Sequence, residues 1–556
     1  MNPISNNKIK MILRGINKYK TLLVVCFALN IGVLYAQSGS EVIKFSGSAS
    51  VFDNFYSSSG IDPRQPANLF TTVLRANITL FDQIELPFEL YYSSRQTEFQ
   101  QPFNQFGVSP KITSWLTLHG GYFSTQFSEL TFGDLRILGG GLELTPGDFR
   151  FKAVYGRSRQ SVEPNKVSFM PGVYQQNIYA VSIGYGNQAK TFLNVNLFHA
   201  KDDSTTVNYD TLRVAPNENL VGSLDFGIAF SEAVSVRGEV GVSAFSGDLG
   251  AEKIDDISIS SYLLTPNIST KIDAAAKLQI NVKPSRYWSV GLASRWIGPG
   301  FKSLGYALMP NDLMEFTISP SLRLLNNKLN IRSRAGVRYN NLQNQRMSTT
   351  SRFTGYIAAN WQVNKIFGID VNYNNNQIES GHKNDTLRLS NVFNSVSVSP
   401  RFFFNSFGGT NNLILTYSYQ DVSDKNAYTS EITGSKSNSA YIVHSLSYAS
   451  TLSFATTCLY NNTKLADCTS EIYHVSETVS RRFFKNSLST SLSLRANFVH
   501  VTSNTTQLVF RVNATYSLKK LGNLSFYITN NNYNGTGAVT QNYNEIYGSL
   551  QYNINF

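Results

Sequence analysis

The chain lacks a long apolar run, a block of charge and a boundary between domains. After Ala36, no stretch approaches the roughly 20 apolar residues that a transmembrane helix needs. Charged residues make up only 15% of the chain, and no linker or low-complexity segment divides it. The net charge of +12 invites a nucleic-acid interpretation. Because the basic residues are scattered and no nucleic-acid module is recognisable, we expect no nucleic-acid partner. Because no linker divides the chain, we expect a single domain over residues 37–556.

Motifs for catalysis and metal binding are also missing. None of the six histidines lies in a nucleophile elbow or an H-E-x-x-H helix. Gly139-Gly140-Gly141 is not followed by Lys-Ser/Thr, so a closely packed strand is favoured over a phosphate loop. The C-x9-C spacing is not that of a zinc site, and His474 nearby does not complete four ligands. We therefore predict no enzymatic activity, no metal site and no cofactor.

The start of the chain has the pattern of an export signal. Residues 1–20 contain five basic residues and no acid, and an apolar run from Leu22 to Tyr35 follows. A basic region, an apolar region and a small residue at the cut describe a secretory signal peptide. The run is short for a membrane anchor, and Asn30 interrupts it. Residues 1–36 are therefore predicted to be a signal peptide that is cleaved near Ala36.

Beyond the leader, apolar and polar side chains alternate with a period of two. Residues 314–325, 329–339 and 507–518 each place apolar side chains on one face and polar side chains on the other. Aromatic residues make up 13% of the chain. This balance suits strands with one face in lipid and one face in water. A soluble β-sandwich also alternates, but a sandwich of this length would normally split into several domains.

The turns between these segments alternate in length. Tight turns are predicted at Asp82-Gln83, Pro146-Gly147-Asp148, Gly186-Asn187, Ser231-Glu232, Lys283-Pro284, Asn326-Asn327, Asn364-Lys365 and Lys519 to Gly522. Longer polar connections are predicted near 57–67, 160–176, 203–217, 246–270, 379–388 and 425–437. Short periplasmic turns and longer extracellular loops are typical of outer-membrane barrels. The predicted fold is all-β: a transmembrane antiparallel up-and-down β-barrel of about 22 to 26 strands.

The last residues, IYGSLQYNINF, end on an aromatic side chain of the apolar face. This ending resembles the C-terminal signal strand of bacterial outer-membrane β-barrels. The resemblance implies that Tyr552, Ile554 and Phe556 form an assembly signal. It also implies an integral protein of the outer membrane, whose partners are the lipid bilayer and the barrel assembly machinery.

The whole layout resembles a group of poorly characterised, porin-like outer-membrane barrels of the Bacteroidota. The resemblance is strongest over residues 102–157, which include the segment GGYFSTQFSELTFGDLRILGGGLELTPGDF. Weaker support comes from two loop ends, Asp210-Thr211-Leu212-Arg213 and Asp385-Thr386-Leu387-Arg388. The group brings no established biochemical activity with it.

A set of basic side chains is the candidate functional site. If the apolar faces contact lipid, six basic residues of four successive predicted strands project into the lumen: Lys277, Arg295, Arg323, Arg332, Arg334 and Arg338. Rings of Arg or Lys bias a pore toward anions. The alternative is that they pair with acidic loop residues such as Asp255 and Asp256 and close the lumen.

Two cysteines remain after the predicted cleavage. Cys458 and Cys468 flank the turn-like segment Leu459 to Asp467. In the oxidising periplasm or at the cell surface this arrangement predicts a disulfide across a hairpin. Two free thiols are the alternative.

These observations predict a porin-like diffusion channel for hydrophilic solutes, and the basic lumen wall favours anionic ones. The alternative is a plugged or closed barrel. Such a barrel would act as a scaffold or receptor, or as a component of an outer-membrane export or assembly complex with a plug or surface partner.

Overall fold

The computed structural model describes residues 43–81, 84–94, 105–133, 135–164, 172–207, 214–254, 263–382, 384–501, 503–536 and 542–556. The predicted signal peptide and the loop end at residues 210–213 lie outside the described residues, as do Asp255 and Asp256. Within the described part, helical structure is limited to α3 (Ser430–Thr433) and the 3-10 turns η1 (Asp385–Leu387) and η2 (Lys519–Leu521). No helix there is long and apolar enough to cross a membrane.

The described residues form 27 strands. The first fourteen are β1 (Ile43–Ser59), β2 (Asn68–Leu80), β3 (Ile84–Ser93), β4 (Gln105–Val108), β5 (Lys111–Thr113), β6 (Leu116–Ser124), β7 (Arg136–Leu144), β8 (Phe149–Arg159), β9 (Gln175–Gly186), β10 (Phe192–Asp203), β11 (Glu218–Ala229), β12 (Val234–Ser246), β13 (Thr270–Val282) and β14 (Trp288–Ile297). The others are β15 (Leu313–Leu324), β16 (Leu329–Asn340), β17 (Ser348–Gln362), β18 (Phe367–His382), β19 (Ser390–Ser406), β20 (Gly409–Asp424), β21 (Ser435–Ser447), β22 (Ser453–Lys464), β23 (Thr469–Phe483), β24 (Leu488–His500), β25 (Asn504–Ser517), β26 (Asn523–Thr536) and β27 (Tyr543–Asn555).

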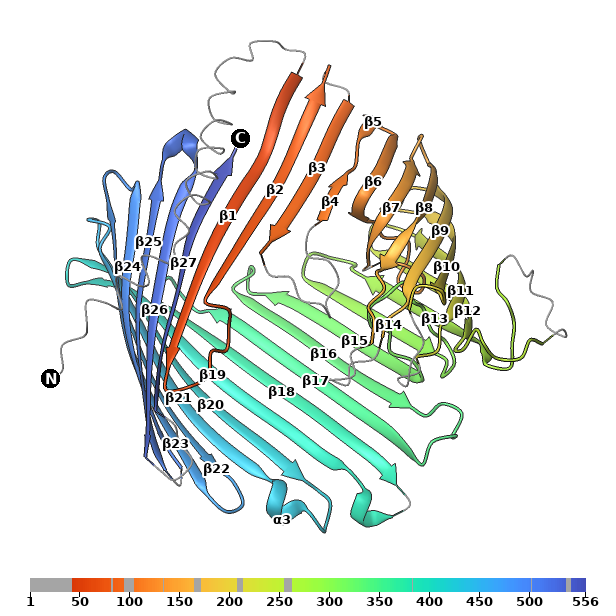
Figure 1. The fold of residues 1–556 in the computed structure, drawn as a ribbon. Helices are drawn as coiled ribbons and strands as arrows, with labels where there is room; N and C mark the ends of the chain where they lie inside the picture. Colours follow the sequence, from red (N-terminus) through yellow and green to blue (C-terminus); the bar gives the residue numbers. More distant parts are fainter. Residues whose placement is uncertain are drawn as a thin grey trace.

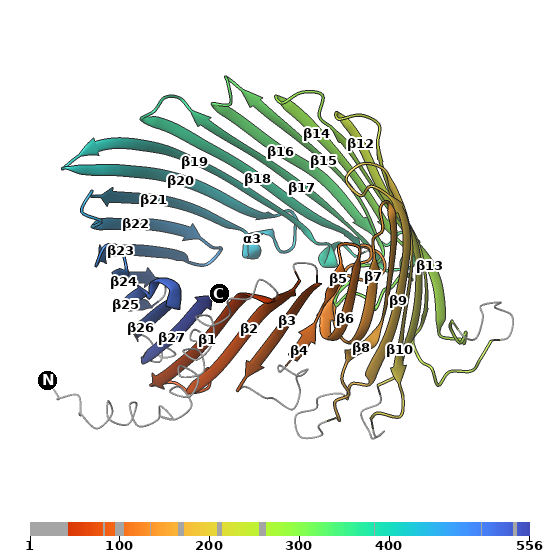
Figure 2. The same cartoon turned by 90° about the horizontal axis from the view of Figure 1, so that it is seen from above.

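Neighbouring strands pair antiparallel in chain order, and the wall closes on itself (Figures 1 and 2). The short strands β4 and β5 both lie between β3 and β6, so the wall has 26 strand positions. Strands β1 and β27 pair from Ser48 opposite Asn555 to Ser59 opposite Asn544. A closed barrel leaves no sheet edge unpaired in lipid. The predicted fold class is confirmed, with a strand number at the upper end of the predicted range.

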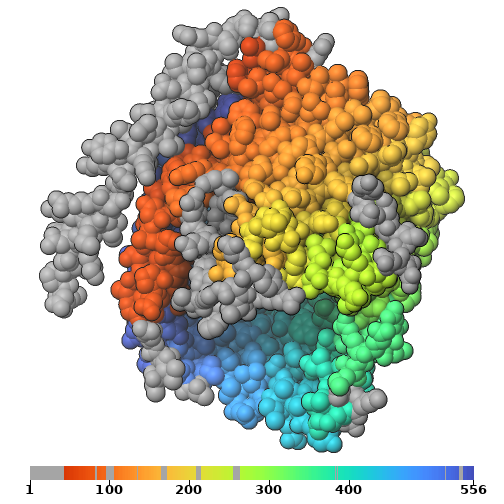
Figure 3. All heavy atoms as spheres, turned by 45° about the vertical axis from the view of Figure 1, so that its right-hand side comes forward, coloured from red at the N-terminus to blue at the C-terminus, as the bar shows by residue number. Residues whose placement is uncertain are grey.

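The two faces of the wall differ in the way that the alternation predicts. On β15, Phe316 and Ile318 point outward, and each is 43% exposed. Figure 3 shows one side of the molecule, with atoms of the first half of the strands in its upper part and atoms of the later strands below. The polar residues that alternate with Phe316 and Ile318 along β15, such as Glu315 and Thr317, point into the barrel and line a cavity there. An apolar belt outside and a polar surface inside define a transmembrane barrel.

Tight turns and long loops segregate to opposite rims of the barrel. Residues 283–287 and 325–328, for example, connect strands at one rim, which we call the tight-turn rim. The segments 298–312 and 425–434 connect strands at the opposite rim, the long-loop rim. The predicted asymmetry of the turns is therefore confirmed for the described residues.

Gly139, Gly140 and Gly141 lie within β7, as a closely packed strand requires. A Cβ atom on Gly139 would lie 2.1 Å from the carbonyl oxygen of Tyr155 on β8. Only glycine tolerates such an approach of two backbones.

Candidate functional site

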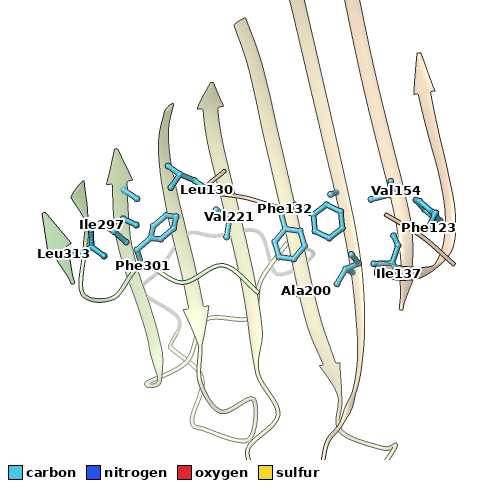
Figure 4. Packing of buried hydrophobic residues seen from close by; sticks show 14 residues of the cluster. Phe123, Leu130, Phe132, Ile137, Val154, Ala200, Val221, Ile297, Phe301 and Leu313 are labelled. Carbon is cyan, nitrogen blue, oxygen red and sulfur yellow. The ribbon is translucent and has the colours of Figure 1, made fainter. Parts of the chain in front are cut away.

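Two loops from the long-loop rim fold back inside the barrel. They comprise residues 125–133, which follow β6, and residues 298–312, which join β14 to β15. We call the pair the inner shelf. Their side chains Leu130, Phe132 and Phe301 are at most 1% exposed, because they pack on the inner face of the wall. Figure 4 shows this apolar cluster between the shelf and strands of the first half of the chain.

Part of the wall under the shelf is apolar on its inner face. The Phe132 ring stacks on that of Phe198 from β10, with centroids 5.5 Å apart. Inward-facing Ile178 and Ala180 on β9 and Val221 on β11 are also fully buried in this cluster. These strands carry apolar residues on both faces because one face meets the membrane and the other meets the shelf.

The two loops of the shelf are bonded to each other. Phe132 and Gly305 form an isolated parallel β-bridge, and Gly133 N donates to Gly305 O at 3.3 Å. The hydroxyls of Ser303 and Tyr306 donate to the carbonyl oxygens of Thr131 and Ser128, respectively. The shelf is therefore one layer built from two distant segments.

Polar side chains of the wall bind the backbone of the shelf. Glu239 Oε1 accepts from Leu130 N at 3.1 Å. Asn219 donates through Nδ2 to Lys302 O and accepts through Oδ1 from Leu304 N, both at 2.9 Å. Burial lowers the pKa of Lys302, whose Nζ lies 4.0 Å from the centroid of the Phe245 ring. Because buried backbone groups without partners cost free energy, these bonds stabilise the shelf in its docked position.

A cavity of about 910 Å³ lies beside the shelf, between the shelf and the tight-turn rim. Its charged lining residues come from the shelf and from strands β11 to β16. The basic ones are Arg237, Lys277, Arg295, Arg334 and Arg338. The acidic ones are Glu129, Asp225, Glu239 and Glu315.

The structure brings together four of the six basic residues singled out from the sequence. Lys277, Arg295, Arg334 and Arg338 all line the cavity. Arg323 and Arg332 point inward on the same part of the wall, nearer the tight-turn rim, and are not in the lining. Their influence on ion selectivity stays a prediction.

Acidic neighbours neutralise part of this basic set. Glu315 accepts from Arg295 at 2.8 Å and from Arg338 at 2.9 Å, and Glu129 of the shelf pairs with Lys277. Glu315 and Glu129 were not predicted from the sequence, which pointed to Asp255 and Asp256 as the acidic partners. Strand register was the missing signal, since Glu315 lies directly opposite both Arg295 and Arg338.

Arg323, Arg332 and Arg334 make no ion pair with any residue that the structure describes. Their three positive charges therefore remain available to a solute in the lumen.

The predicted disulfide between Cys458 and Cys468 is wrong, since both cysteines are free. Cys458 lies within β22, opposite Val475, whereas Cys468 immediately precedes β23 in the turn. At about 3.3 Å per residue, this register separates them by roughly 20 Å along the hairpin. Disulfides need Cα atoms within about 7 Å. The sequence spacing misled because it placed the turn midway between the cysteines.

Tyr552, Ile554 and Phe556 share the outward side of β27 at the tight-turn rim. The Tyr552 hydroxyl donates to Leu521 O at 2.5 Å, and Ile554 is buried. Phe556 exchanges backbone hydrogen bonds with Gly47, at 2.7 and 3.0 Å, where the wall closes. Their role as an assembly signal stays a prediction.

Two histidines of the described part of the chain contact polar or aromatic side chains of neighbouring strands and loops. His199 lies 3.0 Å from Glu218 Oε1 and stacks on Tyr179, and His119 contacts Ser109 Oγ at 2.8 Å. No group of three or more His, Cys, Asp and Glu residues there could hold a metal ion.

The fold and the inner shelf define a large transmembrane β-barrel whose lumen is partly filled by its own loops. No family model matches the chain, and no curated protein matches it. Several solved structures are similar at low identity. The P pilus usher (PapC) translocation pore is 10% identical with a TM-score of 0.36, over 92% of this chain and 99% of that chain.

Two porins give similar values. A BenF-like porin from Pseudomonas fluorescens Pf-5 is 10% identical with a TM-score of 0.32, over 68% of this chain and 99% of that chain. OccK2 (OpdF) of Pseudomonas aeruginosa, in complex with glucuronate, is 10% identical with a TM-score of 0.28, over 92% and 98%. Likenesses of this degree carry no information about what this protein transports or binds.

Proposed function

We propose that the protein is an outer-membrane channel for hydrophilic solutes, narrowed by the inner shelf. The observation that carries this proposal is the cavity of about 910 Å³, lined by charged residues and bounded by the shelf inside a closed wall. Charged groups in a narrowed passage replace part of the hydration shell of a polar solute and exclude apolar ones. A barrel built only for anchoring needs no such lining.

The solutes are proposed to be small and preferentially anionic. Glu315 and Glu129 neutralise part of the basic set, so the preference is moderate. The charges of Arg323, Arg332 and Arg334, which have no ion pair among the described residues, supply it. A passage lined by one sign of charge concentrates counter-ions.

Conductance of the purified, folded protein in a planar bilayer tests this function. We expect discrete conductance steps and, under a salt gradient, a reversal potential that favours anions. The preference should fade in concentrated salt, because charges are screened beyond about 3 Å at 1 M. Folded protein that never conducts would contradict the channel and favour the plugged scaffold or receptor.

The outer membrane of a Gram-negative cell is the proposed location. The signal-peptide pattern of residues 1–36 and the resemblance of residues 102–157 to barrels of the Bacteroidota support it. The protein should fractionate with the outer membrane and migrate differently on gels before and after heating. Phe556→Ser should lower the amount assembled if the barrel assembly machinery reads the terminal strand, and normal levels would show that it does not.

A further inference from the structure

One part of the outward surface is polar at a depth where its surroundings are apolar. It crosses three adjacent strands, β21 to β23 (Figure 1), and consists of His444, Thr456 and Glu477. The next outward residues on two of these strands, Ile442 and Val475, are 48% and 49% exposed, as lipid-facing residues are. We call the three polar residues the outer stripe.

Strand register holds the outer stripe in line. His444 lies opposite Thr456, and Thr456 lies opposite Glu477. Thr456 Oγ1 donates to Glu477 Oε2 at 2.5 Å, and His444 Nε2 is 2.8 Å from Asn411 Oδ1. Nδ1 of His444 and Oε1 of Glu477 have no hydrogen bond to any described residue. The stripe therefore presents two unused polar atoms to whatever covers this wall.

Glu477 lies well inside the apolar belt. The Tyr473 ring, 5.0 Å from that of Tyr460, lies toward the long-loop rim, and Phe483 lies at the tight-turn end of β23. At about 3.3 Å per residue, Glu477 is roughly 13 Å from Tyr473 and roughly 20 Å from Phe483 along the strand. Ionisable side chains that face lipid at such a depth are costly, and they usually pair with another polar group.

The alignment of three polar residues distinguishes this region from an isolated acid. Asp53 on β1 also points outward, but its cross-strand neighbours are Phe70 and Leu550. A lone carboxyl group can remain neutral in lipid. The outer stripe instead combines an imidazole, a hydroxyl and a carboxyl group on consecutive strands.

We propose that a second copy of this chain covers the outer stripe and forms a two-fold dimer within the membrane. The stripe is self-complementary, because His444 and Glu477 lie on either side of Thr456. A two-fold axis along the membrane normal that passes β22 places His444 of each copy opposite Glu477 of the other. Strand tilt of roughly 40° offsets the two groups in depth by about 6 Å, which two facing side chains can span. Nδ1 of His444 and Oε1 of Glu477 then form a hydrogen bond, in which a protonated imidazole donates to the carboxylate or a protonated carboxyl group donates to the neutral imidazole.

Cys458 of the native chain provides a cross-linking site that tests the proposed dimer. It lies on β22, two residues from Thr456 and on the same outward face, so the proposed axis brings the two copies of Cys458 together. In membranes that contain the full chain, a short bifunctional maleimide should produce a band of twice the monomer mass. Cys458→Ser should lose that band, and the matched control Cys468→Ser should keep it.

Variants of the outer stripe test its part in the dimer. Their readout is the cross-linked band, which does not depend on whether the protein conducts ions. Glu477→Leu should lose the cross-linked band while its gel migration still changes on heating, since leucine suits a lipid-facing strand. The double exchange His444→Glu with Glu477→His should restore the band, because a two-fold pair stays complementary when both positions are exchanged. A dimer that persists in Glu477→Leu, or Cys458 that links only to a different protein, would overturn the proposal.

Discussion

The inner surface of the barrel has two unlike halves. In the covered half, from β6 to β15, the inner shelf packs on the wall and buries inward apolar side chains such as Phe198 and Val221. From β16 onward, in what we call the bare half, no loop that the structure describes covers the wall, and inward Tyr356 and Tyr441 are 39% and 38% exposed. The same closed sheet therefore serves as a packing surface on one side and as a wetted surface on the other.

The inward polar side chains of the two halves also have different hydrogen-bond partners. In the covered half, Asn219 and Glu239 bind the backbone of the shelf. In the bare half, amides bind along the wall: Asn497 Nδ2 donates to Gln507 Oε1 at 2.9 Å, and Gln507 Nε2 donates to Asn531 Oδ1 at 2.8 Å. The comparison shows that the shelf narrows the lumen asymmetrically, so any passage runs against the bare half and the basic residues beside it.

Removing half of the shelf should have the largest effect. Asp312 N already donates to Gly298 O at 3.2 Å, so replacing residues 299–311 by Asn-Gly closes the gap without strain. We expect the conductance to rise severalfold, because the narrowing layer is lost. Shortening residues 426–433 in the bare half is the control and should leave conductance nearly unchanged. Equal conductance of the two deletions would show that the shelf does not narrow the passage.

Phe132→Ala should destabilise the covered half strongly. The ring is fully buried against Phe198, and deleting a buried Phe side chain costs about 3–5 kcal/mol of unfolding free energy. Phe393→Ala, at an inward and only half-buried position of β19, should cost much less. Urea unfolding in lipid vesicles gives both values, and similar losses would mean that the two halves are packed alike.

Arg334→Glu should shift ion selectivity toward cations. Arg334 lines the cavity and has no ion pair among the described residues, so reversing its charge acts on the passage directly. Arg511→Glu is the matched change on β25 in the bare half, where Arg511 lies 5.5 Å over the Tyr527 ring. The effect of Arg511→Glu should be smaller, because Arg511 does not line the cavity and charges more than about 10 Å from a passing ion are screened at 0.1 M salt. The reversal potential under a salt gradient distinguishes them.

Gln507→Leu should have the smallest effect, a loss of about 1 kcal/mol in unfolding free energy. It removes the link between Asn497 and Asn531, but water in the bare half can replace it. Asn219→Leu, which breaks comparable bonds under the shelf, should cost more because no water replaces them. Equal losses would indicate that the wall around Gln507 is as dry as the wall under the shelf.

The alternation of side chains predicted the strands and which side chains face outward, because with a period of two the apolar set must face the lipid and the polar set the lumen. The lengths of the turns predicted the two rims. The shelf was not predicted, since residues 125–133 and 298–312 have no period and dock through contacts between distant segments. A signal for it was present in β9 and β10, where Ile178, Ala180 and Phe198 put apolar residues at inward positions. The pairing of Glu315 and the separation of Cys458 from Cys468 both depend on register, which spacing along the chain does not reveal.

The bond between Ser303 and Thr131 joins residues 172 positions apart. Every strand from β7 to β14 must be in place before these two loops can meet. A growing barrel therefore passes through a stage in which the wall is complete on this side while Phe132 and Phe301 still face water. The shelf can narrow the lumen only after this part of the wall has formed.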